Sequence, residues 1–84
     1  MNKVYILIQD YAIQFDTELR IKAYKSMDGA KKAFRTAVEE SKKIDKVNNF
    51  EVFDDTETSY TAYIDGEETE NHSRIYIEEV EVEN

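Results

Sequence analysis

The chain has 84 residues and a formal net charge of −8, and it contains neither cysteine nor proline. A chain of this length can enclose one small hydrophobic core, so we expect a single domain spanning residues 1–84. Without cysteine the chain forms no disulfide and offers no thiolate to a metal, which favours a reducing, cytoplasmic setting. The early apolar run at residues 4–8 is too short for a signal peptide or a membrane span, so we expect no membrane association.

Residues 3–15 are predicted to form one long strand. In its first half, apolar side chains alternate on both faces, which is typical of a strand at the centre of a sheet. In its second half the large apolar side chains change parity, so we expect a bulge near Gln9 or Asp10. A turn at residues 16–18 leads into a second strand at residues 19–25, whose charged side chains indicate an edge strand.

Residues 26–48 are predicted to form one amphipathic helix. Ser26 is a suitable N-cap because its hydroxyl can accept a hydrogen bond from a free amide of the first turn. The Asn48–Asn49 pair is expected to end the helix. Small and apolar side chains recur at a spacing of three and four and form one stripe, whose alanines let a helix lie close to a sheet. The stripe consists of Ala30, Ala33, Phe34, Ala37, Val38, Ser41 and Ile44.

Three further strands are predicted at residues 50–53, 60–64 and 74–82, separated by polar turns. The last strand changes its apolar parity, which predicts a second bulge at Glu78–Glu79. The order ββαβββ predicts an α+β fold in which an antiparallel sheet of four or five strands carries the helix on one face. In the expected core, Ala30, Phe34, Ala37 and Val38 of the helix pack against Val4, Ile6, Ile21 and Ile75.

The sequence contains no recognisable catalytic motif, and we expect no enzymatic activity and no cofactor. The single histidine, His72, lies in a polar segment, and we expect it to be solvated, without the orienting partner that a catalytic histidine needs. Glu67, Glu68 and Glu70 stand close to it in the sequence. Their spacing matches neither a calcium-binding loop nor the histidine pairs of zinc sites, so we expect no metal there.

The charges are distributed unevenly along the chain. Residues 1–46 have a formal charge of +3, whereas residues 47–84 have a formal charge of −11, with Arg74 as their only arginine or lysine. A surface of this sign repels nucleic acid and attracts a basic protein, although acidity that serves only solubility is an equally open alternative. The candidate partner-binding acids are Glu51, Asp54, Asp55, Glu57, Glu67, Glu68, Glu70, Glu79, Glu81 and Glu83.

A second candidate surface is aromatic. If the predicted core residues face the helix, the alternation of the strands places several tyrosines on the opposite, uncovered face of the sheet. Tyrosine is enriched at protein interfaces, so this face is a candidate partner or dimer surface. Two alternatives are a merely tolerated wet face and, less consistent with the net charge, a platform for stacking RNA bases. The face consists of Tyr5, Leu7, Tyr24, Tyr63 and Tyr76.

Three segments carry a resemblance to known proteins: KVYIL near the start, AYKSMDGAKKAF leading into the helix, and IYIEEVEV near the end. They resemble small ββαββ proteins of phages, prophages and plasmids of Gram-positive bacteria. The resemblance implies a mobile-element protein in the cytoplasm of a bacterial host. Small acidic proteins of such elements often bind and block a host protein, the anti-CRISPR proteins being the best-known group.

Two functions follow as hypotheses. The first is an inhibitor or adaptor that presents acidic strands to a basic, nucleic-acid-binding host protein, in part as a DNA mimic. Glutamates on one face of the last strand lie about 7 Å apart, whereas duplex DNA carries one charge per about 1.7 Å, so several elements would have to contribute. The second is a self-associating module that dimerises through the tyrosine face or the last strand, with acidity serving solubility.

Overall fold

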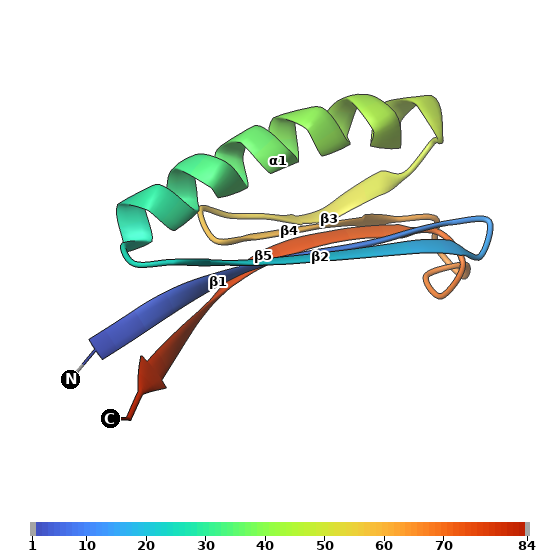
Figure 1. Cartoon of the computed structure of the whole chain (residues 1–84). Coiled ribbons are helices and arrows are strands. Elements are labelled where there is room, and N and C mark those ends of the chain that lie inside the picture. The colour runs from blue at the N-terminus through green and yellow to red at the C-terminus, as the bar shows by residue number, and fades with distance from the viewer. Residues whose placement is uncertain (1, 84) are drawn as a thin grey trace.

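The computed structural model describes residues 2–83, in which five strands and one helix follow the order ββαβββ. The strands form one antiparallel sheet, and the helix lies across one face of it (Figure 1). This arrangement confirms the α+β fold that the sequence predicts. The elements are β1 (Asn2–Ile13), β2 (Asp16–Tyr24), α1 (Met27–Val47), β3 (Glu51–Asp55), β4 (Ser59–Tyr63) and β5 (His72–Val82).

Strands β1 and β5 lie inside the sheet, whose order is β2-β1-β5-β4-β3. The inner position of β1 and the edge position of β2 are as predicted. Both ladders of β1, with β2 and with β5, run without a register shift. The bulges expected near Gln9 or Asp10 and at Glu78–Glu79 are therefore wrong, and the register shift lies instead in β3, between Val52 and Asp54.

A two-residue turn joins β1 to β2. Its residues, Gln14 and Phe15, have φ angles of 51° and 70°, and the strand pair that flanks them is Ile13 with Asp16. Two positive φ angles in a two-residue loop are typical of a type I′ turn, whose twist matches that of the strands it joins. The turn expected at residues 16–18 is thus displaced, because those residues already pair with β1.

Helix α1 begins and ends as predicted. The Ser26 hydroxyl oxygen accepts a hydrogen bond from the amide of Gly29 at 3.1 Å. At the other end, the side-chain amide of Asn48 donates to the carbonyl of Ile44 at 2.9 Å. Ile44 itself is 52% exposed, so its expected place on the buried stripe is wrong. The buried residues of the helix are Ala30, Phe34, Ala37, Val38, Ser41 and Asp45.

On β1 and β2, the face of the sheet that meets α1 is the opposite of the one expected, whereas Ile75 on β5 lies in the core as predicted. Leu7 is buried in the core with Phe34 and Ile75, and Tyr24 packs against them. Val4, Ile6 and Ile21 lie on the other face, because continuous alternation keeps Leu7 on the side of α1. The alanines of the helix stripe leave room for larger side chains below them, and leucine and tyrosine fill that room. The core consists of Leu7, Phe34, Ala37, Val38, Phe50, Tyr60, Ala62 and Ile75.

Candidate functional site

The face of the sheet opposite α1, here called the open face, carries a continuous apolar surface. One row across β2, β1 and β5 places Ile21 beside Ile8, and Ile8 beside Tyr76. Leu19 and Ile21 are 62% and 63% exposed, so two large aliphatic side chains meet solvent on this face. We call this surface the open-face patch, and it consists of Val4, Ile6, Ile8, Leu19, Ile21, Tyr76, Val80 and Val82.

Carboxylates border the open-face patch. Asp10 lies opposite Arg74 at one end of it. Glu78 lies on the part of β5 that extends past β4 and forms the margin of the sheet. Glu51 and Asp54 lie on the same face, on β3. Arg74 is the only arginine or lysine that the strands of residues 2–83 place on this face. The open face therefore combines an apolar centre with an acidic rim.

The segment between β4 and β5 closes one end of the open face. Figure 1 shows this segment, in orange, folding on the side of the sheet away from α1. Ala12 and His72, which pair with each other at this end, are both buried. Nδ1 of His72 lies 2.6 Å from the carbonyl oxygen of Glu68, within this segment. The open-face patch thus ends at Asp10, where this cover begins.

His72 is buried at 7% exposure, so the expectation of a solvated histidine is wrong. Its Nε2 lies 3.0 Å from Oδ1 of Asp10, and its Nδ1 contacts the Glu68 carbonyl. A backbone carbonyl and a carboxylate oxygen both accept hydrogen bonds, so a ring N–H of His72 has an acceptor at each of these contacts. The contacts hold the loop to the sheet, which is a structural role.

The structure divides the predicted tyrosine face between the two sides of the sheet. Tyr63 and Tyr76 lie on the open face, and the Tyr63 ring stacks on Phe53 with centroids 4.0 Å apart. Tyr5, Leu7 and Tyr24 lie on the side of α1, so their place on an uncovered face is wrong. The error has one cause: on β1 and β2 the residues that face α1 are those of the other parity from the one predicted.

The ten predicted acidic residues lie in three separate places. Residues 79–83 lie at the end of β5, whereas residues 67–70 follow β4 at the other end of the sheet. Residues 51–57 form β3, at the far edge of the sheet, and the start of the turn that follows it. The structure therefore distributes them over both ends and one edge of the sheet. The groups are Glu79, Glu81 and Glu83; Glu67, Glu68 and Glu70; and Glu51, Asp54, Asp55 and Glu57.

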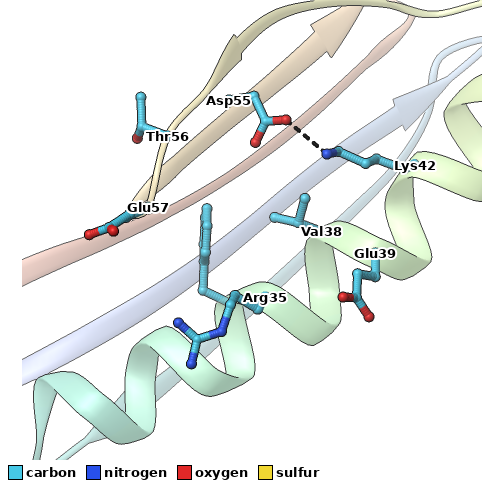
Figure 2. Close-up of a pocket in the computed structure, with 8 residues that line it drawn as sticks. Arg35, Val38, Glu39, Lys42, Asp55, Thr56 and Glu57 are labelled. Carbon is cyan, nitrogen blue, oxygen red and sulfur yellow. Dashed lines mark hydrogen bonds and ion pairs between the residues drawn. The ribbon is translucent and has the colours of Figure 1, made fainter.

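A groove of about 440 Å³ lies between α1 and the β3–β4 hairpin (Figure 2). Across it, Nζ of Lys42 donates to a carboxylate oxygen of Asp55 at 2.8 Å. A second ion pair joins Lys31 to Glu57 at 3.4 Å. Ligand sites are mainly apolar with a few convergent polar groups, whereas this lining is largely charged. The groove is therefore best described as the place where Lys31 and Lys42 of α1 form ion pairs with the β3–β4 hairpin.

A buried polar cluster surrounds Asp45, which is 2% exposed. Its carboxylate accepts hydrogen bonds from the hydroxyls of Ser41 (3.0 Å), Tyr60 (2.6 Å) and Ser73 (2.6 Å). Burial, followed by the hydrogen bond to Asp45, raises the pKa of Tyr60. All four groups are enclosed between α1 and the sheet, where a substrate has no access. The cluster joins the end of the helix to β4 and β5 and is structural.

Within residues 2–83, no three His, Cys, Asp or Glu side chains are placed to hold a metal ion together. The helix in this part of the chain lacks the length and apolarity needed to cross a membrane. No family model, no curated protein and no solved structure matches the chain.

Proposed function

We propose that the chain is a protein-binding module, an inhibitor or adaptor, that engages a basic partner protein through the open face of its sheet. The observation that carries the proposal is the open-face patch itself, an apolar surface on three adjacent strands with carboxylates around it. Contiguous exposed apolar surface with a polar rim is typical of protein interaction sites.

The free energies of apolar burial and of ion pairing suggest different roles for the apolar centre and for the rim carboxylates. Burying a leucine or isoleucine side chain contributes about 1.5–3 kcal/mol, whereas an exposed ion pair contributes at most about 1 kcal/mol. The exposed side chains of Leu19 and Ile21 would therefore supply affinity. The rim carboxylates would orient the partner and accelerate its approach.

The charge of the open face favours a basic partner over a second acidic one. Asp10, Glu51, Asp54 and Glu78 stand on it, and within the strands of residues 2–83 Arg74 is the one arginine or lysine that opposes them. Lys25, just beyond β2, adds one positive charge beside Val4 and Val82 at the end of the patch. The formal net charge of −8 adds a field of the same sign, which attracts a lysine- or arginine-rich surface at long range. Two copies of this face brought together would oppose like charges, and such opposition is destabilising.

An inhibitory role of the anti-CRISPR type is the form of this proposal that the resemblance to mobile-element proteins favours. DNA mimicry is the weaker form, because the glutamates at the end of β5 stand about 7 Å apart on one face and duplex DNA carries a charge every 1.7 Å or so. Burial of the apolar centre would contribute more binding free energy than a row of exposed charges.

Two synthetic peptides test the surface chemistry directly, one alternating leucine with lysine and one alternating leucine with glutamate. We expect the lysine peptide to shift the amide resonances of the strand residues in the open-face patch, and the effect to weaken as salt screens the rim. The glutamate peptide, with the same leucines, should leave these resonances unchanged. Shifts confined to α1, or equal shifts with both peptides, would overturn the proposal.

Matched variants separate the patch from general surface effects. Ile21→Lys places a charge in the patch, and Val47→Lys places the same charge on an exposed apolar residue at the end of α1. Binding of the lysine peptide should fall at least tenfold with Ile21→Lys and stay unchanged with Val47→Lys. A protein captured from a bacterial lysate should be lost with the first variant and retained with the second.

A further inference from the structure

Strand β2 offers a long, regular edge to a further strand. It has nine residues, contains no proline and pairs with β1 without a register shift. All of its residues except Tyr24 are exposed. The other edge of the sheet, β3, has five residues and is interrupted by its register shift. Long, flat edge strands are templates for pairing, whereas short or bulged edges are protected.

The hairpin geometry determines which backbone groups of β2 face outward. A two-residue turn closes on a hydrogen-bonded pair, here Ile13 with Asp16, and such pairs alternate along an antiparallel ladder. The amides and carbonyls of Asp16 and every second residue after it therefore point to β1. Those of Thr17, Leu19 and Ile21 point to the free edge, where another strand can bond to them.

The side chains of β2 follow a symmetric charge pattern centred on Leu19. Asp16 and Glu18 precede this residue, and Arg20 and Lys22 follow it at the same distances in reverse order. All four lie on the side of the sheet that faces α1, because they share the parity of Tyr24. Nε and one terminal nitrogen of Arg20 already donate to Glu18 at 3.1 and 2.8 Å, which shows that charges of opposite sign meet on this surface.

We propose that β2 pairs with β2 of a second copy of the chain, antiparallel and centred on Leu19. This register places Asp16 opposite the partner's Lys22 and Glu18 opposite the partner's Arg20, and the symmetry repeats both pairs. On the open face, Leu19 meets the partner's Leu19. The two five-stranded sheets become one sheet of ten strands, with the outward amides and carbonyls of both edges satisfied.

Charge selects this register among its neighbours. A shift that centres the pairing on Arg20 sets the two Arg20 side chains against each other, and a shift that centres it on Glu18 sets the two glutamates together. Centring on Ile21 opposes Arg20 to the partner's Lys22. Directly opposed like charges destabilise a strand pair, so only centring on Leu19 leaves every charged pair attractive. The contact is small, so we expect a transient dimer that forms at high protein concentration.

Two charge-swapped variants test the pairing. The first carries Asp16→Lys with Glu18→Lys, and the second carries Arg20→Glu with Lys22→Glu. Each variant alone opposes like charges in every pair, so sedimentation should show each as a monomer at concentrations where the natural chain, of 9.9 kDa, approaches twice that mass. An equimolar mixture restores attraction in all pairs, and we expect a heterodimer in it that rising salt weakens.

Leu19→Pro tests the backbone part of the proposal. The substitution removes an outward amide that the monomer does not use, so circular dichroism should remain that of a folded chain while self-association falls at least tenfold. A monomeric natural chain at every concentration would overturn the proposal. So would a mixture of the charge-swapped variants without heterodimer, or a Leu19→Pro chain that is folded and dimerises as before.

Discussion

Nε2 of His72 lies 3.0 Å from Oδ1 of Asp10, although 62 residues separate the two along the chain. The contact joins the start of β5 to the last part of β1, and the same imidazole contacts the Glu68 carbonyl through its other nitrogen. One side chain thus connects the segment between β4 and β5 to the centre of the sheet.

His72→Ala should loosen this connection. Buried hydrogen bonds that involve charged groups contribute about 1.5–3 kcal/mol, so the free energy of unfolding in urea should fall by about that amount. Amide exchange in residues 65–71 should accelerate more than exchange in α1. Asp65→Asn, at an exposed position of the same segment, is the control and should change neither quantity. Unchanged exchange in the segment after His72→Ala would contradict the proposed role.

Asp45→Ala should be among the most destabilising single changes in the chain. It leaves the hydroxyls of Ser41, Tyr60 and Ser73 without their acceptor in a buried site, at a cost of about 1–3 kcal/mol for each. We expect a loss of at least about 3 kcal/mol by urea denaturation, compared with less than about 0.5 kcal/mol for Glu40→Ala on the exposed helix surface. Similar losses for the two variants would show that the cluster contributes little.

The raised pKa values of Tyr11 and Tyr60 predict that the folded chain loses stability at alkaline pH. Burial raises the pKa of Tyr11 to about 12, against an opposing effect of Arg20, and the pKa of Tyr60 is also raised. Because the folded chain keeps these protons to a higher pH than the unfolded chain, the stabilisation is complete below pH 10 and declines as the pH rises towards about 12. Urea melts across this range should show the decline, and Tyr11→Phe with Tyr60→Phe should flatten it. An equally steep decline in the double variant would contradict the assignment.

Phe34→Ala and Ile21→Ala distinguish the two faces of the sheet. Phe34 is 2% exposed beneath α1, so its truncation should cost about 3–5 kcal/mol. Ile21 lies exposed on the open face, so its truncation should cost less than about 1 kcal/mol. Urea denaturation of both variants gives the comparison. A large loss of unfolding free energy for Ile21→Ala in the monomer would show that Ile21 belongs to the core, as the sequence pattern predicts.

Ser26→Ala should remove the N-cap of α1. The hydroxyl that accepts from the Gly29 amide is lost, and such a loss costs about 1 kcal/mol. Ser26→Asp preserves an acceptor at the same place and should retain most of the stability. Amide exchange in the first turn measures the effect locally, and identical exchange in the alanine and aspartate variants would place the cap elsewhere.

The sequence predicts the elements of this fold better than their orientation. The stripe from Ala30 to Ser41, the cap at Ser26 and the order ββαβββ all follow from local patterns. The face of β1 does not, because Val4, Ile6 and Ile8 on one side compete with Tyr5 and Leu7 on the other. The complementarity of large strand side chains to an alanine-rich helix decides between them, and that is a property of two elements together.

The polar interior is equally hard to predict. Asp45 continues the buried spacing four residues after Ser41, which is the one sequence feature that could have revealed it. His72 has no comparable local feature, because its partner Asp10 lies at the other end of the chain. The sequence does not predict the open-face patch for the same reason that it does not predict the core face of β1. The parity of β1 and β2 decides both which side chains face α1 and which remain on the open face.

The pairing of β1 with β5 determines when the chain can fold as it leaves the ribosome. The first hairpin and α1 emerge while one edge of β1 still lacks its neighbour, because β5 begins only at His72. Contacts so distant in sequence form slowly, and until they form, Leu7 and the unpaired edge of β1 remain accessible to other chains. Until the last strand has been translated, the nascent chain therefore carries a strand edge to which another chain can pair.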